Sequence, residues 1–75
     1  GATMTTPENT TLIGTADGGR LAIYSEDLSW NYRVLDTKTG KWMVNPDPDF
    51  PRFDRVNDVF HDLDTGERWA LELSR

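Results

Sequence analysis

Apolar and polar residues alternate in the first half of the chain, in short runs that are separated by turn-forming residues. The first two runs, residues 12–16 and 20–25, lie on either side of Asp17-Gly18-Gly19. Asp and Gly accept the positive φ angles that a tight hairpin needs. This pattern predicts a β-hairpin.

A second hairpin is predicted further along the chain, by residues 32–35 and 41–44. The turn between them begins with Asp36 and ends with Gly40, as a hairpin loop with a bulge requires. A similar Asp-Thr-Gly sequence recurs at residues 64–66. We interpret this echo as the same turn chemistry used twice.

Alternation returns at the end of the chain and predicts a strand over residues 68–73. Along such a strand, every second side chain points to the same face of the sheet. Trp69, Leu71 and Leu73 therefore share one face, and the polar or small residues between them share the other.

The segment between the second hairpin and the last strand has a different pattern. Residues 45–51 contain three prolines and predict a stiff, extended connector. Beyond it, apolar residues recur at intervals of three and four, which is the spacing of one helical face: Phe53, Val56, Phe60 and Leu63. With Asp49 as a cap, Pro51 in the first turn and Gly66 beyond the end, we expect a helix over residues 53–63.

An alternative interpretation of the same segment makes residues 59–63 a strand. This strand would form a hairpin with the final strand through the turn at residues 64–66. Asp62 and Asp64 favour this alternative, because the helix macrodipole disfavours acidic residues at the C-terminal end of a helix.

The predicted order of elements is ββββαβ, in the α+β class and mainly β. It comprises a small antiparallel sheet of about five strands with one short helix packed on it. We expect residues 1–11 to be a flexible arm, of which residues 1–3 are a tag remnant. Residues 12–75 then form a single small globular domain.

Composition narrows the classes of function. The 75 residues contain no cysteine and carry a net charge of −5. We therefore expect no disulfide and no thiolate metal site, and the charge disfavours a generic nucleic-acid binder. No apolar run is long enough to span a bilayer and no secretory signal is predicted. We accordingly expect a cytoplasmic protein without a membrane partner, and leave its oligomeric state open.

Catalytic and metal-binding chemistry find little support in the sequence. His61 is the one histidine, and none of the three serines lies in a nucleophile-elbow sequence. Asn45, Asp47 and Asp49 resemble the start of a calcium-binding loop, but Phe50 stands where that loop needs Gly. We expect no enzymatic activity, no metal site and no cofactor.

An acidic stripe is the first candidate binding surface. On the predicted helix, Asp54, Asp58 and Asp62 would follow one another at intervals of four residues and form a like-charged row. Docking on a basic protein surface would relieve their repulsion. The alternative is a solvated polar face that Arg55 partly neutralises.

Aromatic residues are the second candidate. We expect Trp42 and Trp69 to lie in the core, whereas Tyr24, Trp30 and Tyr32 are candidates for an exposed hot spot beside the acidic stripe. The predicted function is thus a non-enzymatic protein-protein interaction domain or inhibitor. The alternative is a nucleic-acid-binding β-rich module that uses four residues of the sheet: Tyr32, Arg33, Lys41 and Trp42.

Overall fold

The fold is given by a computed structural model that describes residues 9–27, 31–47 and 49–74. Within these ranges the chain forms seven β-strands and no helix, and so no helix that could span a bilayer. The strands are β1 (Thr10–Ala16), β2 (Leu21–Glu26), β3 (Tyr32–Asp36), β4 (Lys41–Trp42), β5 (Phe53–Val56), β6 (Val59–Asp62) and β7 (Arg68–Leu73).

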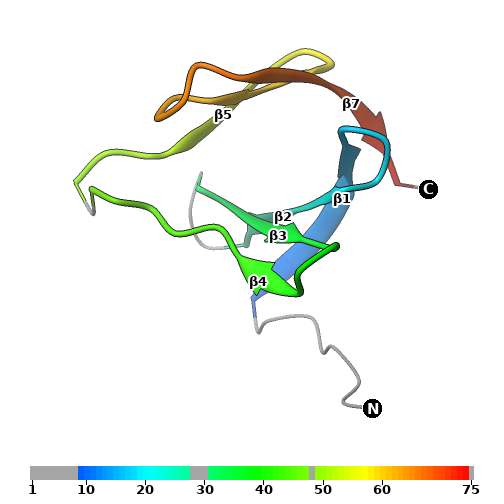
Figure 1. The fold of residues 1–75 in the computed structure, drawn as a ribbon, viewed down its shortest axis with the longest axis horizontal. Helices are drawn as coiled ribbons and strands as arrows, with labels where there is room; N and C mark the ends of the chain where they lie inside the picture. The colour runs from blue at the N-terminus through cyan, green and yellow to red at the C-terminus, as the bar shows by residue number, and fades with distance from the viewer. Residues whose placement is uncertain (1–8, 28–30, 48, 75) are drawn as a thin grey trace.

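All seven strands belong to one antiparallel sheet, in the order β4-β3-β2-β1-β7-β6-β5. Strands β1 to β4 form one meander, strands β5 to β7 form another, and the pairing of β1 with β7 joins the two. The sheet curls into a half-barrel, so that β5 and β7 lie across from β2 and β3 (Figure 1). β4 and β5 are the edge strands, and residues 43–52 connect them.

The core fills the concave face of the curled sheet. Phe60 is completely buried there; its ring stacks on Phe53 with the centroids 5.4 Å apart, and Tyr32 meets it edge-on at 5.3 Å. Such ring pairs add to the free energy that burial of their large apolar area contributes. Six of the seven strands supply the buried cluster: Ala16, Leu21, Ile23, Val34, Phe53, Phe60 and Leu71.

The predicted helix over residues 53–63 is wrong. This segment forms the hairpin β5–β6, in which Phe53 pairs with Asp62 and Val56 pairs with Val59. Asn57 occupies the turn with φ of 53°, a conformation that Asn tolerates better than most residues. The alternative interpretation is confirmed for β6, which pairs with β7.

The remaining strand predictions agree with the structure in most respects. The strand over residues 68–73 and both predicted hairpins are confirmed, although β4 is only two residues long. The sheet has seven strands instead of about five, and β1 begins at Thr10, two residues before the expected start of the domain. The rest of the expected arm, residues 1–8, lies outside the described part of the chain.

The two turns repeat one another, but the residue equivalent to Asp36 is Asp62 and not Asp64, so that residues 62–66 match residues 36–40. Oδ1 of Asp36 accepts hydrogen bonds from the amides of Lys38 and Thr39, and the carbonyl of Asp36 accepts one from Gly40 at 2.8 Å. Oδ1 of Asp62 and its carbonyl accept the equivalent bonds from the amides of residues 64, 65 and 66. In each turn the Asp carboxylate therefore accepts the backbone amides that no longer have a partner strand where the strand ends.

Close packing of backbones holds the two meanders together. In the β1–β7 pair, Gly14 lies opposite Leu73, and a Cβ atom at this position would overlap the carbonyl oxygen of Glu72. Beside it, the amide of Ser74 donates to the carbonyl of Ile13 at 2.8 Å. The join between the meanders thus depends on a residue without a side chain.

Candidate functional site

Three side chains on the convex face of the sheet form an aromatic platform, which we define as Tyr24, Arg33 and Trp42. The rings of Tyr24 and Trp42 meet edge-on with their centroids 5.4 Å apart. The guanidinium carbon of Arg33 lies over the Trp42 ring, 5.4 Å from its centroid. This contact is a cation–π interaction, and it lies at β4, an edge strand of the sheet.

Strand register explains why these three side chains meet. Tyr24 of β2 pairs with Arg33 of β3, and Leu35 of β3 pairs with Trp42 of β4. Cross-strand partners share a face, and residues two apart on one strand also share it. The turn that begins at Asp36 sets the register that brings Trp42 next to Leu35.

The prediction that both Trp42 and Trp69 lie in the core is correct only for Trp69, which packs against the buried cluster. Trp42 lies on the opposite face because it pairs with Leu35, whereas the core residue is Val34. Leu35 and Ala22 pair across β2 and β3 on the convex side and are buried as well. Apolar burial next to the platform therefore extends outside the concave core.

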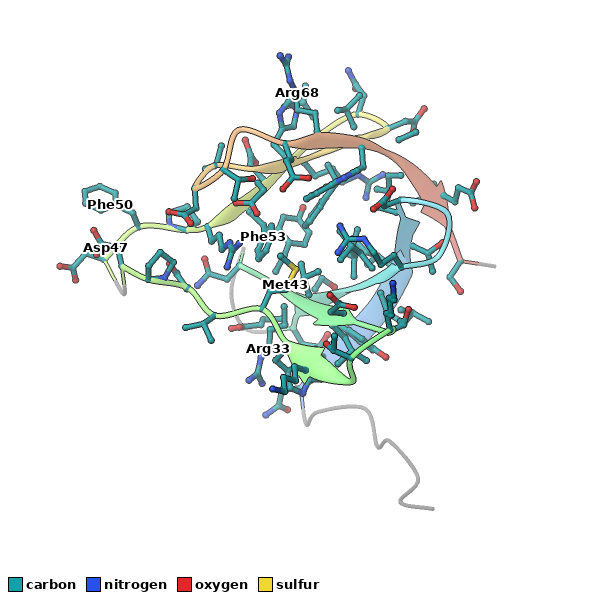
Figure 2. All side chains as sticks on the ribbon, in the orientation of Figure 1. Arg33, Met43, Asp47, Phe50, Phe53 and Arg68 are labelled. Carbon is teal, nitrogen blue, oxygen red and sulfur yellow. The ribbon has the colours of Figure 1, made fainter. Side chains whose placement is uncertain are left out.

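Exposure and charge make the platform available for binding. Tyr24 and Trp42 are half-buried, and Arg33 is exposed. Among the described residues, the ion pairs involve Arg20 and Arg52 but not Arg33. Figure 2 shows that Arg33 and Arg68 point away from the molecule on opposite sides, whereas Met43 and Phe53 point into the curl.

Asp62 is a buried acidic group that is bonded to an arginine and to two backbone amides. Its side chain is fully buried and accepts hydrogen bonds from Nε and Nη2 of Arg52 at 3.0–3.3 Å. Burial by itself would raise the pKa of the Asp62 carboxyl, but bonds from Arg52 and from the amides of Asp64 and Thr65 hold that pKa below its ordinary value. Arg52 also donates to the carbonyl of Val44 at 2.6 Å, so this buried ion pair links the connector to the β6–β7 turn.

The acidic stripe predicted from the sequence does not form. Asp54 lies on β5 and Asp58 in the β5–β6 turn, and both are exposed, whereas Asp62 is 1% exposed and points inward. The row depended on one continuous helix. In the hairpin the three residues lie on β5, in the turn and on β6, so they do not form a row on one surface. Asp62 is therefore a structural group, and only Asp54 and Asp58 remain at the surface.

The predicted aromatic residues also separate. Tyr32 packs on Phe60 in the concave core, Tyr24 belongs to the platform, and Trp30 lies outside the described residues. Of the residues named for the nucleic-acid alternative, Arg33 and Trp42 come together. Lys41 pairs with Asp36 and lies on the other face by strand alternation.

Two features of the structure were not predicted from the sequence. One is the ion pair of Arg52, because nothing in the pattern of residues 45–52 indicates that a cation next to the three prolines is buried. The other is the ring contact between Tyr24 and Trp42. Alternation would predict it only if Leu35, and not Val34, were already known to lie on the convex face.

A cleft of about 300 Å³ lies between β3–β4 and the connector. Its charged lining residues are Glu26, Arg33 and Arg52, and Arg52 is already bonded to Asp62 and Val44. No serine, histidine or lysine is among the residues that line it, and His61 lies on β6 opposite Asp54 and Arg68. The cleft thus holds neither a nucleophile–base pair nor, within the described ranges, a cluster of His, Asp and Glu that could hold a metal ion.

Comparison with protein-family models, with curated proteins and with solved structures finds no match to this chain.

Proposed function

We propose that this chain is a non-enzymatic protein-binding module that uses the aromatic platform as its contact surface. The observation that supports the proposal most directly is the assembly of Trp42, Tyr24 and Arg33 on the convex face, outside the core. Trp, Tyr and Arg are the residue types that dominate binding energy in protein interfaces. The contacts of Trp42 with Tyr24 and Arg33 are already made in the chain by itself, which lowers the cost of ordering these side chains on binding.

The charge of the chain favours a protein partner over a nucleic acid. The chain carries a net charge of −5, and the platform contains a single cation, Arg33. Tight non-specific binding to nucleic acid requires several phosphate contacts from clustered cations. An acidic chain is instead attracted to a protein with a basic surface, because complementary charge raises the rate of association. Asp54 and Asp58 are exposed and contribute to this attraction.

The proposal is tested with a matched pair of charge reversals, Arg33→Glu and Arg68→Glu. Both arginines are exposed on strands, on opposite sides of the molecule (Figure 2), and both substitutions change the net charge equally. We expect a protein partner from the native host to be retained by the original chain and by Arg68→Glu. Retention by Arg33→Glu should fall about tenfold or more. This factor corresponds to the loss of about 1.4 kcal/mol of binding energy at one interface residue.

Equal retention by all three chains would contradict the proposal. A nuclear magnetic resonance titration with a single-stranded oligonucleotide at low salt tests the other candidate. Shifts at Tyr24, Arg33 and Trp42 that disappear steeply with added salt would support nucleic-acid binding in its place.

A further inference from the structure

An apolar groove with an acidic rim lies on the connector, separate from the aromatic platform. It has a volume of about 310 Å³ and is formed where residues 45–47 and 50–52 meet the β6–β7 turn. Phe50 and Leu63 contribute its apolar surface and are 68% and 55% exposed. In Figure 2, Phe50 and Asp47 both point outward from the connector, whereas Phe53 points into the core.

The polar atoms of the groove wall are largely bonded within the protein. Asn45 Nδ2 donates to the carbonyl of Phe50 at 2.8 Å, and the amides of Asp47 and Phe50 donate to Asn45 Oδ1 and to the carbonyl of Asp47. The amide of Leu63 donates to the carbonyl of Arg52 at 2.6 Å. These bonds fix the shape of the wall, so that a ligand meets mainly apolar side chains and carboxylates.

The charges of the groove are unbalanced. Its charged lining residues are Asp47, Arg52 and Asp64, and the cation of Arg52 is neutralised by Asp62. Among the described residues, neither Asp47 nor Asp64 forms an ion pair. The groove therefore presents two uncompensated carboxylates beside an exposed apolar floor, and exposed apolar surface with a polar rim marks a site of interaction.

We propose that this groove binds a segment of a partner protein in which one large apolar side chain is flanked by Lys or Arg. The apolar side chain would cover Phe50 and Leu63, and the flanking cations would pair with Asp47 and Asp64. Charge complementarity selects this occupant, because an acidic apolar segment would be repelled by both carboxylates. The site is distinct from the platform, so the inference holds or fails independently of the proposed function.

The test uses three short fluorescent peptides and measures their anisotropy with the full chain. The first peptide has a central Leu between pairs of Lys; the second replaces Leu by Ser, and the third replaces Lys by Glu. We expect the first to bind and the other two to bind at least about tenfold more weakly. The double variant Phe50→Ser/Leu63→Ser should lower the affinity for the first peptide by a similar factor, and Asp47→Asn/Asp64→Asn should reduce both its affinity and its dependence on salt.

Matched variants locate the site. Val56 is 52% exposed on β5, outside the groove, so Val56→Ser should leave binding unchanged. Arg33→Glu should not weaken it, because the platform is not involved. The proposal is overturned if the first peptide does not bind, if the Ser peptide binds equally well, if the Phe50→Ser/Leu63→Ser variant keeps its affinity, or if Arg33→Glu abolishes binding.

Discussion

Asp36 and Asp62 occupy the same position in two turns of the same design, but their surroundings differ. Each carboxylate accepts two amides of its own turn and contacts one arginine. The side chain of Asp62 is fully buried and lies 3.0 Å from Arg52, whereas that of Asp36 is 22% exposed and lies 3.4 Å from Arg20. A buried, closely bonded ion pair loses far more than an exposed one when a partner is removed.

We expect Asp62→Asn to lower the free energy of unfolding by about 3 kcal/mol, because the substitution leaves the cation of Arg52 buried without its counter-charge. Asp36→Asn should cost less than about 1 kcal/mol, because solvent screens the pair with Arg20. Asn retains the ability to accept the turn amides in both variants. Urea unfolding measures both values, and equal losses would show that burial does not distinguish the two turns.

The dependence of stability on pH follows from the lowered pKa of Asp62. An unfolded Asp titrates near about 3.9, so on acidification the unfolded chain takes up the proton before the folded chain does. The contribution of Asp62 is therefore complete above about pH 5 and is lost as pH falls through the unfolded value and then through the lowered pKa of the folded chain. Asp62→Asn should flatten the decline of unfolding free energy over this acidic range, as measured by urea unfolding at a series of pH values.

The hairpin β5–β6 shows why periodicity alone misassigned an element. Phe53 and Phe60 lie on one face of a helix because of their spacing, but they also lie on one face of a hairpin whose turn is at Asn57 and Asp58. Phe53 pairs with Asp62 and Arg55 with Phe60, so both rings point inward. The deciding information is the turn, and an Asn-Asp pair is a weaker turn signal than the Asp-Gly and Thr-Gly sequences that identified the other hairpins.

Substitutions at Asn57 distinguish the hairpin from a helix by the order of their effects. In the hairpin, φ of 53° at this position costs a residue with a Cβ about 1–2 kcal/mol, and Gly avoids that cost. Asn57→Gly should therefore leave stability within about 0.5 kcal/mol, and Asn57→Ala should lower it by about 1 kcal/mol. A helix would reverse the order, because Ala is the more stable residue in a helix by about 1 kcal/mol. Urea unfolding of the two variants provides the comparison.

The same reasoning explains how much of the candidate sites was accessible from the sequence. Alternation predicted that Tyr24 lies on a strand of the first hairpin and that Arg33 and Trp42 lie on paired strands of the second. It predicted neither the pairing of β2 with β3 nor which face of the sheet the core would occupy. That choice depends on β5–β7 folding over β1–β3, which places Val34 and not Leu35 in the concave core. The groove is harder to predict still, since Phe50 and Leu63 are thirteen positions apart in the sequence. The Arg52–Asp62 ion pair and the bond from the Leu63 amide to the Arg52 carbonyl hold their segments together.

At the scale of the whole molecule, the two proposed surfaces belong to different halves of one curled sheet. The platform lies on β2, β3 and β4, and the groove combines the connector with the β6–β7 turn. Two links hold these halves in register: the β1–β7 pairing at Gly14 and the connector tied by Arg52 to Val44. Arg52 itself lines the groove, whereas Gly14 belongs to neither surface, so a change at Gly14 should alter both surfaces without touching either.

Gly14→Ala tests the first link. The added methyl group would overlap the carbonyl oxygen of Glu72, and separating the strands to relieve this clash should cost about 1–3 kcal/mol, as overpacking of a tight contact does. The effect should reach across the sheet, with faster hydrogen exchange at the amide of Ser74, which donates to Ile13. Gly18→Ala is the matched control, because Gly18 has a φ of 64° but open space around it. Gly18→Ala should cost about 1 kcal/mol and should speed hydrogen exchange only near the β1–β2 turn. If Gly14→Ala likewise speeds exchange only at its own position, the contact at Gly14 does not hold the two meanders together.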